Sequence, residues 1–200
     1  MRRFFFLAVS VLTTTLALAQ TNPNAERTDD KQQDLLGQGT LNAGVNVSAG
    51  YSGYVGLTGR VVPRLQYFLK DGWSVALEGR YETNGSQYRY MGGGLSTRYY
   101  FVRDRRLALF GQAGATYGQS RYRSYYDPAN PYSLYRSFNT YREYKQPAWQ
   151  VAAGLGVHYR LSNRWSLEGV AERTLTNNVG LFRGFSRWQG SVGVNFRLGK

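Results

Sequence analysis

The chain has 200 residues, a formal net charge of +13 and no cysteine. This length suits one domain with a single core or one small barrel, and it is too short for several independent domains. The lack of cysteine excludes a disulfide framework, a thiol nucleophile, a thiolate metal site and a lipid-modified cysteine anchor. The basic residues are scattered along the chain rather than clustered, so we predict no nucleic-acid partner despite the charge.

The first segment has the order of a secretory signal. Two arginines precede an apolar run over residues 4–18, which ends in an Ala-Leu-Ala sequence before Gln20. This order predicts a signal peptide at 1–19, because the run falls short of the ~20 apolar residues that a membrane anchor needs. Residues 20–37 are polar and unpatterned and are predicted to form a flexible periplasmic lead-in. No later apolar run is long enough for a membrane-spanning helix.

From residue 38 to residue 200 the chain alternates between apolar and polar residues, as Val45, Asn46 and Val47 illustrate. A period of two predicts strands rather than helices. The predicted strands cover residues 41–51, 55–67, 73–82, 90–101, 107–117, 149–160, 165–174 and 188–198. About ten residues is the length with which a tilted strand crosses a bilayer, and an even number of strands lets the sheet close. Pro63 lies inside the second strand, where we expect a bulge or kink.

The connections between the predicted strands alternate in length. Short turns follow the second, fourth and sixth strands, whereas long links are predicted at 118–146 and 176–187; the link at 52–54 is a short exception. Short turns on one rim and long loops on the other are typical of outer-membrane barrels and place the N-terminus in the periplasm. The predicted extracellular loop 118–146 is rich in Tyr and Arg, which favours either recognition of an external ligand or a stiff extension of the flanking strands.

Alternation alone does not decide which face meets lipid, because ligand-binding soluble barrels alternate as well. All four tryptophans lie on the apolar face near strand ends, as expected for aromatic girdles: Trp73, Trp149, Trp165 and Trp188. The opposite face carries the residues of a predicted lumen charge network: Arg60, Arg64, Glu78, Arg80, Glu82, Arg98, Arg160, Glu168, Glu172 and Arg197. Exposing such an arginine at the bilayer midplane costs ~2–4 kcal/mol, so the charged face is predicted to point inward.

Four arginines at the long-loop end are predicted to contact the phosphates of lipopolysaccharide. Arg89 and Arg173 lie on the lipid-facing phase of their strands near this end. Arg121 and Arg123 lie at the start of the predicted long loop. Arginine binds phosphate through paired, charge-assisted hydrogen bonds, which is the reason for this prediction.

The final strand carries the most specific motif. Residues 191–198 read Ser-Val-Gly-Val-Asn-Phe-Arg-Leu, which resembles the signal that the barrel assembly machinery recognises in small outer-membrane β-barrels of the OmpX and OmpA transmembrane-domain type. Many members end on an aromatic residue, whereas Gly199 and Lys200 follow here. The resemblance covers nearly all of the mature sequence. It implies an eight-stranded antiparallel up-and-down transmembrane β-barrel in the bacterial outer membrane, without a cofactor.

We predict no catalytic residues and no metal site. Related lipid A deacylase barrels place a serine two residues after an outward histidine, whereas Arg160 follows an inward His158 here. Pairs such as Glu78 and Glu82 suit acid–base chemistry, but nearby arginines would hold them ionised as structural partners. His158 is interpreted as a packed, hydrogen-bonded lumen residue rather than a pH sensor.

The expected function is therefore a monomeric, non-enzymatic outer-membrane barrel with a structural or surface-recognition role and no open pore. Its expected partners are outer-membrane lipid, lipopolysaccharide and an extracellular ligand that the sequence does not identify. The alternatives are a lipid-modifying enzyme, a small-solute channel and a soluble secreted barrel.

Overall fold

The computed structural model describes residues 33–52, 56–85, 87–124, 142–177 and 185–199. The predicted signal peptide at 1–19 and the lead-in up to residue 32 lie outside the described residues. The described chain forms one short helix and eight strands: α2 (Gln33–Leu36), β1 (Leu41–Ser52), β2 (Gly56–Lys70), β3 (Trp73–Thr83), β4 (Tyr88–Arg103), β5 (Leu107–Ser124), β6 (Arg142–Arg160), β7 (Trp165–Thr176) and β8 (Phe185–Gly199).

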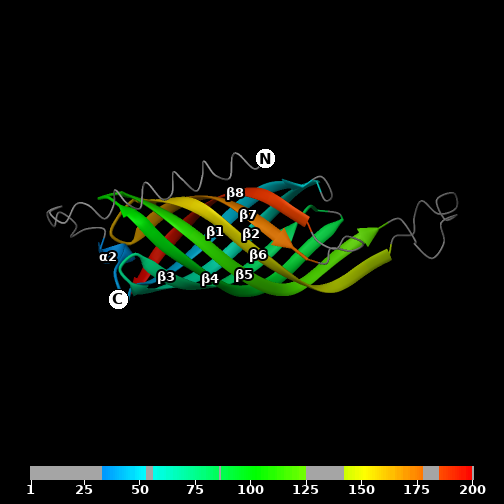
Figure 1. Ribbon diagram of the computed structural model, residues 1–200, viewed down its shortest axis with the longest axis horizontal. Coiled ribbons are helices and arrows are strands. Elements are labelled where there is room, and N and C mark those ends of the chain that lie inside the picture. The colour runs from blue at the N-terminus through cyan, green and yellow to red at the C-terminus, as the bar shows by residue number, and fades with distance from the viewer. Residues whose placement is uncertain (1–32, 53–55, 86, 125–141, 178–184, 200) are drawn as a thin grey trace, which may run out of the picture. The chain divides into compact units, whose positions relative to one another are not determined.

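The strands pair in chain order, each antiparallel to the next, and β8 returns to pair with β1 (Figure 1). The sheet is therefore a closed barrel, which confirms the fold predicted from the alternating pattern. Within the described ranges, no helix has the length and apolarity that a membrane span requires. We call the end that carries the β2–β3, β4–β5 and β6–β7 turns the turn rim, and the opposite end the loop rim.

The two faces of the barrel follow the alternation of the sequence. On β2 and β7, for example, exposed and buried residues alternate almost without interruption. Outward residues such as Leu77 and Leu95 are more than half exposed, at 61% and 66%. Polar residues such as Gln66, Glu78 and Ser96 are buried in the lumen. The arrangement is the reverse of a soluble domain, whose apolar side chains face inward.

The sequence predicted a bulge or kink at Pro63; the structure shows no inserted residue, but the pairing with β3 is interrupted at Val62 and Pro63. Val61 pairs with Tyr81 and Arg64 pairs with Glu78, so the β2–β3 register is the same on both sides of the proline. The position opposite the ring is Gly79, where an added Cβ would lie only 3.1 Å from the Pro63 Cγ. The missing side chain of Gly79 makes room for the ring, and the strand continues without an inserted residue.

The last residues of the predicted lead-in form the short helix α2, which packs against the barrel. Leu35 and Leu36 of α2 are 1% exposed and pack with Phe68 and Phe110 at the turn rim. The Leu36 carbonyl accepts a hydrogen bond of 2.9 Å from the Gly72 amide in the β2–β3 turn. Two adjacent leucines within a polar stretch were the signal for this contact, but only the barrel shows what they pack against.

The predicted long links are partly strand. The β5–β6 pairing continues to Ser124 and Arg142, whereas β7 ends its pairing with β6 at Gln150. This hairpin extends past the neighbouring strands (Figure 1). The range 118–146 is thus not a loop throughout, and its central residues 125–141 lie outside the described chain. Likewise, β8 begins at Phe185, inside the predicted link 176–187.

Candidate functional site

The centre of the lumen is organised around Glu168 of β7. Its carboxylate accepts two hydrogen bonds from Arg98, at 2.6 and 3.0 Å, and one of 3.0 Å from Arg64. The amides of Asn46 and Asn195 also donate to this carboxylate. The side chain of Glu168 is fully buried, and the donors satisfy the charge that burial would otherwise make costly.

Arg98 is held by more than its carboxylate partner. Its guanidinium lies 4.5 Å from the centre of the Phe110 ring, a cation–π geometry. The ring fits because Gly156 lies beside it; an added Cβ at that glycine would collide with Phe110. The small residues of the inner face therefore give the large charged and aromatic side chains the space that they occupy.

Two further buried carboxylates belong to the network: Glu78 on β3 and Glu172 on β7. Glu78 accepts hydrogen bonds from Arg64 at 3.0 Å and Ser96 at 2.6 Å, and Arg80 lies 3.6 Å from it. Glu172 pairs with Arg60 and accepts a hydrogen bond of 2.7 Å from Gln112. The arginines and glutamates thus bridge strands on opposite sides of the barrel.

Arg187 is a lumen residue that the sequence analysis missed. It pairs with Glu82, and both side chains are fully buried. On the sequence alone, Arg187 falls at the end of the predicted link 176–187. The alternation of the last strand does indicate its direction. Trp188 points outward, and neighbouring residues of a strand point to opposite faces, so Arg187 would point inward if the strand began before Trp188.

Two predicted network members lie away from the carboxylates. Arg160 is buried at the turn rim, where it donates to the Ser162 carbonyl at 3.1 Å and to the Asn163 side chain. Arg197 is half-buried, and no ion pair joins it to a glutamate within the described ranges. The other eight predicted residues line the lumen and are buried: Arg60, Arg64, Glu78, Arg80, Glu82, Arg98, Glu168 and Glu172.

Around the central carboxylates, the described side chains leave a small cavity. The pocket between Arg60, Arg64 and Glu172 has a volume of about 10 Å³, which is about the size of one water molecule. Toward the turn rim, Phe68 and Tyr100 join the α2 leucines in an apolar cluster. Toward the loop rim, the buried Tyr88 and Tyr90 fill the interior. The Glu168 network therefore lies between an apolar cluster at the turn rim and a loop-rim layer in which Tyr88 and Tyr90 accompany the Glu82–Arg187 pair.

His158 is packed in the lumen, but it does not make the hydrogen bonds expected from the sequence. Its ring meets Tyr100 edge-on, with ring centres 5.8 Å apart. Neither ring nitrogen has a hydrogen-bond partner among the described protein atoms. Within the same residues, no group of three His, Cys, Asp or Glu side chains could hold a metal ion.

The four tryptophans lie outside the barrel at two levels. Trp149 pairs across strands with Tyr117, and Trp188 pairs with Tyr51, on the loop-rim side. At the turn rim, Trp73 pairs with Tyr99. There Trp165 also packs against Phe196, with ring centres 4.7 Å apart. Aromatic pairs at two levels of an apolar surface match the two interfaces of a bilayer.

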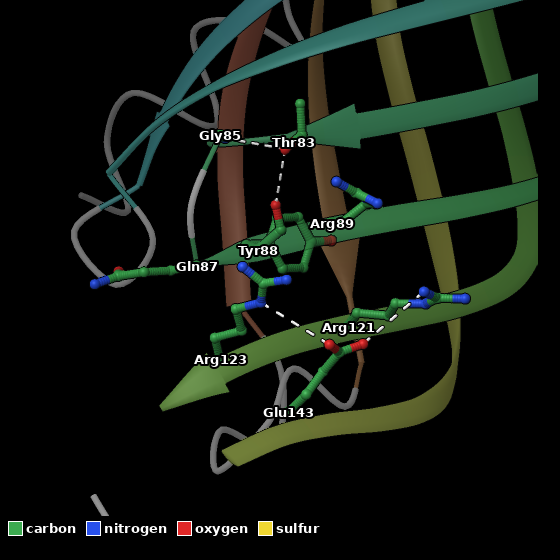
Figure 2. A pocket seen from close by; sticks show the side chains of 8 residues that line it. All are labelled: Thr83, Gly85, Gln87, Tyr88, Arg89, Arg121, Arg123 and Glu143. Carbon is green, nitrogen blue, oxygen red and sulfur yellow. Dashed lines mark hydrogen bonds and ion pairs between the residues drawn. The ribbon is translucent and has the colours of Figure 1, made fainter. Parts of the chain in front are cut away.

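Three of the four arginines predicted to contact lipopolysaccharide lie together at the loop rim. Arg89 of β4 pairs across strands with Arg121 of β5, and Arg123 follows on the same outward face. Figure 2 shows their side chains around one pocket with Glu143. Arg173 lies apart from them on β7, where it hydrogen bonds to Ser186 at 2.7 Å.

A closed eight-stranded barrel with an apolar outer surface and a charged interior is the architecture of the small outer-membrane β-barrels. No protein-family model and no curated protein matches the sequence. Among solved structures, the chain is similar to the N-terminal β-barrel domain of Pseudomonas aeruginosa OprF, with 14% identity and a TM-score of 0.55. That alignment covers 81% of this chain and 99% of the OprF domain.

The chain is also similar to Neisserial surface protein A, with 12% identity and a TM-score of 0.52 over 80% of this chain and 96% of that one. The outer membrane enzyme PagL is similar at 14% identity and a TM-score of 0.50, over 76% and 98% of the two chains. These similarities show that the chain has the fold of small outer-membrane barrels. The fold is shared by a surface protein and an enzyme, so it assigns no activity.

Proposed function

We propose that the chain is a closed-lumen outer-membrane barrel with a structural or surface-recognition role, and that it neither conducts solutes nor catalyses a reaction. The observation that carries this proposal is the packed lumen. Glu168, Glu78 and Glu172 interlock with arginines from several strands, and the pocket between these groups measures about 10 Å³. A continuous water path would need a much wider lumen, as in barrels with twice as many strands.

Each of these carboxylates is engaged by at least one arginine. A general acid or base must exchange a proton with its substrate. Substrate cannot reach a carboxylate inside a packed lumen, and the arginine partners already occupy the carboxylate oxygens. The buried pairs are therefore assigned a structural role.

The surface-recognition part of the proposal rests on the β5–β6 hairpin. Tyr122 and Tyr144 form a cross-strand pair near its end, and Arg123 pairs with Glu143 on the outward side. Tyr and Arg are the residues most often found in binding hot spots. We further propose that the loop rim faces the cell exterior and the turn rim the periplasm, because longer connections are typical of the outer side of such barrels.

The test is conductance of the full chain reconstituted in a planar lipid bilayer. The wild-type protein is expected to give no ion current, whereas the double variant Arg98→Ala with Glu168→Ala, which removes both partners of the central pair, is expected to conduct. Steady conductance by the wild type would overturn the closed-lumen proposal. Hydrolysis of membrane lipid by the purified wild type would overturn the non-enzymatic part.

A further inference from the structure

The strand register assembles a row of cations on the outer face of the loop rim. Arg89 on β4 pairs across strands with Arg121 on β5, and Arg121 pairs in turn with Lys145 on β6. Directly opposite positions on one face of a sheet place side chains within ~5 Å at their Cβ atoms. Arg123 adds a fourth cation two residues further along β5, on the same face. Like charges in such positions repel one another, so this row of cations destabilises the strand pairing.

Among the residues that the structure describes, one carboxylate faces these cations, and it neutralises them only weakly. Glu143 lies 3.9 Å from Arg121, 3.9 Å from Arg123 and 4.0 Å from Lys145. The three cationic side chains are 43%, 49% and 55% exposed. Exposed ion pairs at such distances contribute ~0–1 kcal/mol. Within the described part of the chain, Arg89, Arg121 and Lys145 outnumber the one carboxylate that faces them, so this patch of the outer face carries a net positive charge.

The same residues surround a pocket. It has a volume of about 60 Å³ and is lined by Thr83, Gly85, Gln87, Tyr88, Arg89, Arg121, Arg123 and Glu143. Figure 2 shows Arg121 and Arg123 on either side of the Glu143 carboxylate, with Arg89 nearby on the adjacent strand. This volume accommodates a few water molecules, which is the room that a tetrahedral oxyanion needs.

The position of the pocket relative to the membrane identifies the kind of anion. Tyr117, on the same strand, belongs to the loop-rim aromatic girdle, and Arg121 lies four residues beyond it. At ~3.3 Å per residue and a tilt of ~45°, Arg121 lies about 9 Å beyond the girdle along the barrel axis. The headgroup layer extends ~5–8 Å from the hydrocarbon. Long arginine side chains can bend back over that distance, so their guanidinium groups reach the level of lipid phosphates.

We propose that Arg89, Arg121 and Arg123 form a binding site for the phosphate group of an anionic membrane lipid, with Glu143 as the carboxylate that the phosphate displaces. The forked guanidinium groups donate paired hydrogen bonds to phosphate oxygens. The phosphate then takes the place of Glu143 as the partner of Arg121 and Arg123. Arg173, which was grouped with these residues on sequence grounds, is not part of the site. The inference rests on the membrane placement proposed above.

The experiment measures lipid and phosphate binding by the full chain and four variants. Wild type, Arg121→Gln with Arg123→Gln, Arg89→Gln, Glu143→Gln and Arg173→Gln are each reconstituted with phosphatidylcholine and phosphatidic acid, and the retained lipids are counted by native mass spectrometry. A second arm titrates inorganic phosphate into the detergent-solubilised protein and needs no bilayer. Arg173→Gln is the matched control, because it removes the same charge from the outer face elsewhere.

Phosphatidic acid retention is expected to fall at least about tenfold in the double variant, since each lost charged hydrogen bond is worth about that factor. It should fall in Arg89→Gln, rise in Glu143→Gln and stay unchanged in Arg173→Gln. The rise in Glu143→Gln is the signature of a displaced carboxylate. Equal retention in the wild type and the double variant would refute the site. Phosphate binding in detergent without lipid preference would refute the lipid source while leaving the closed-lumen proposal untouched, because that proposal is tested by conductance.

Discussion

At the residue scale, Glu168 accepts more side-chain hydrogen bonds than any other carboxylate in the described lumen. It accepts hydrogen bonds from Arg98, Arg64, Asn46 and Asn195, which come from four other strands. Its inward direction was predictable, because residues two apart on a strand share a face. Its partners were not, since Arg98 is 70 positions away in the sequence and only closure of the barrel brings the two together.

Replacing Glu168 with Gln is expected to destabilise the folded barrel strongly. The change leaves Arg98 and Arg64 buried without their anion, and removal of one partner from a buried ion pair costs ~3–5 kcal/mol. The measurement is the free energy of unfolding in lipid vesicles, followed by tryptophan fluorescence as denaturant is added. Glu143→Gln is the control: the residue is exposed and its ion pairs are long, so the change should be within ~1 kcal/mol. Equal unfolding of E168Q and wild type would mean that the pair carries no net stability.

At the element scale, strand positions followed from alternation, whereas strand ends did not. β5 and β6 remain paired to Ser124 and Arg142 because each supplies the other with backbone partners beyond the point where β7 ends its pairing with β6. No sequence period reveals where such pairing stops. The bulge expected at Pro63 is absent because Gly79, on the neighbouring strand, accommodates the ring. Gly79 lies opposite Pro63 only in the observed β2–β3 register, and the sequence of one strand alone does not determine that register.

The α2 segment is expected to detach from the turn rim when its leucines are shortened. Leu35→Ala with Leu36→Ala removes buried side chains that are each worth ~2–5 kcal/mol. Because the Gly72 amide donates to the Leu36 carbonyl, its hydrogen exchange should accelerate while exchange in the strand centres stays slow.

The control for this change is Leu161→Ala, which shortens an exposed leucine at the same rim. Unchanged exchange at Gly72 in the double variant would show that α2 is held by its backbone contacts rather than by its leucines. Loss of protection throughout the barrel would instead show that α2 stabilises the whole fold.

At the scale of the whole molecule, the two aromatic levels define a membrane thickness. Trp149 and Tyr159 lie ten residues apart on β6, which corresponds to about 33 Å along the strand and about 23 Å along the axis at a tilt of ~45°. This matches the ~25 Å apolar band of outer-membrane barrels. The agreement supports the assignment of the tryptophan-bearing face to lipid.

The proposed orientation is tested by thiol labelling, because the chain contains no cysteine. Gln87→Cys places a thiol at the loop rim and Arg105→Cys places one at the turn rim, both at exposed positions. A membrane-impermeant maleimide added to intact cells is expected to label the first variant and not the second, whereas both should react after lysis. Labelling of Arg105→Cys alone in intact cells would reverse the orientation.

The sequence by itself determined the fold class, the two faces of each strand and the inward direction of most lumen charges. It could do so because the side-chain period of a strand is a local property, and a strand crossing a bilayer must present apolar residues to lipid. Only the tertiary structure decided which charges pair, as Arg187 does with Glu82. It also decided that α2 packs against the turn rim. Finally, it placed Arg89, Arg121 and Arg123 around one pocket, with Arg173 elsewhere. These contacts join residues from different strands, and the register that aligns them exists only once the sheet has closed.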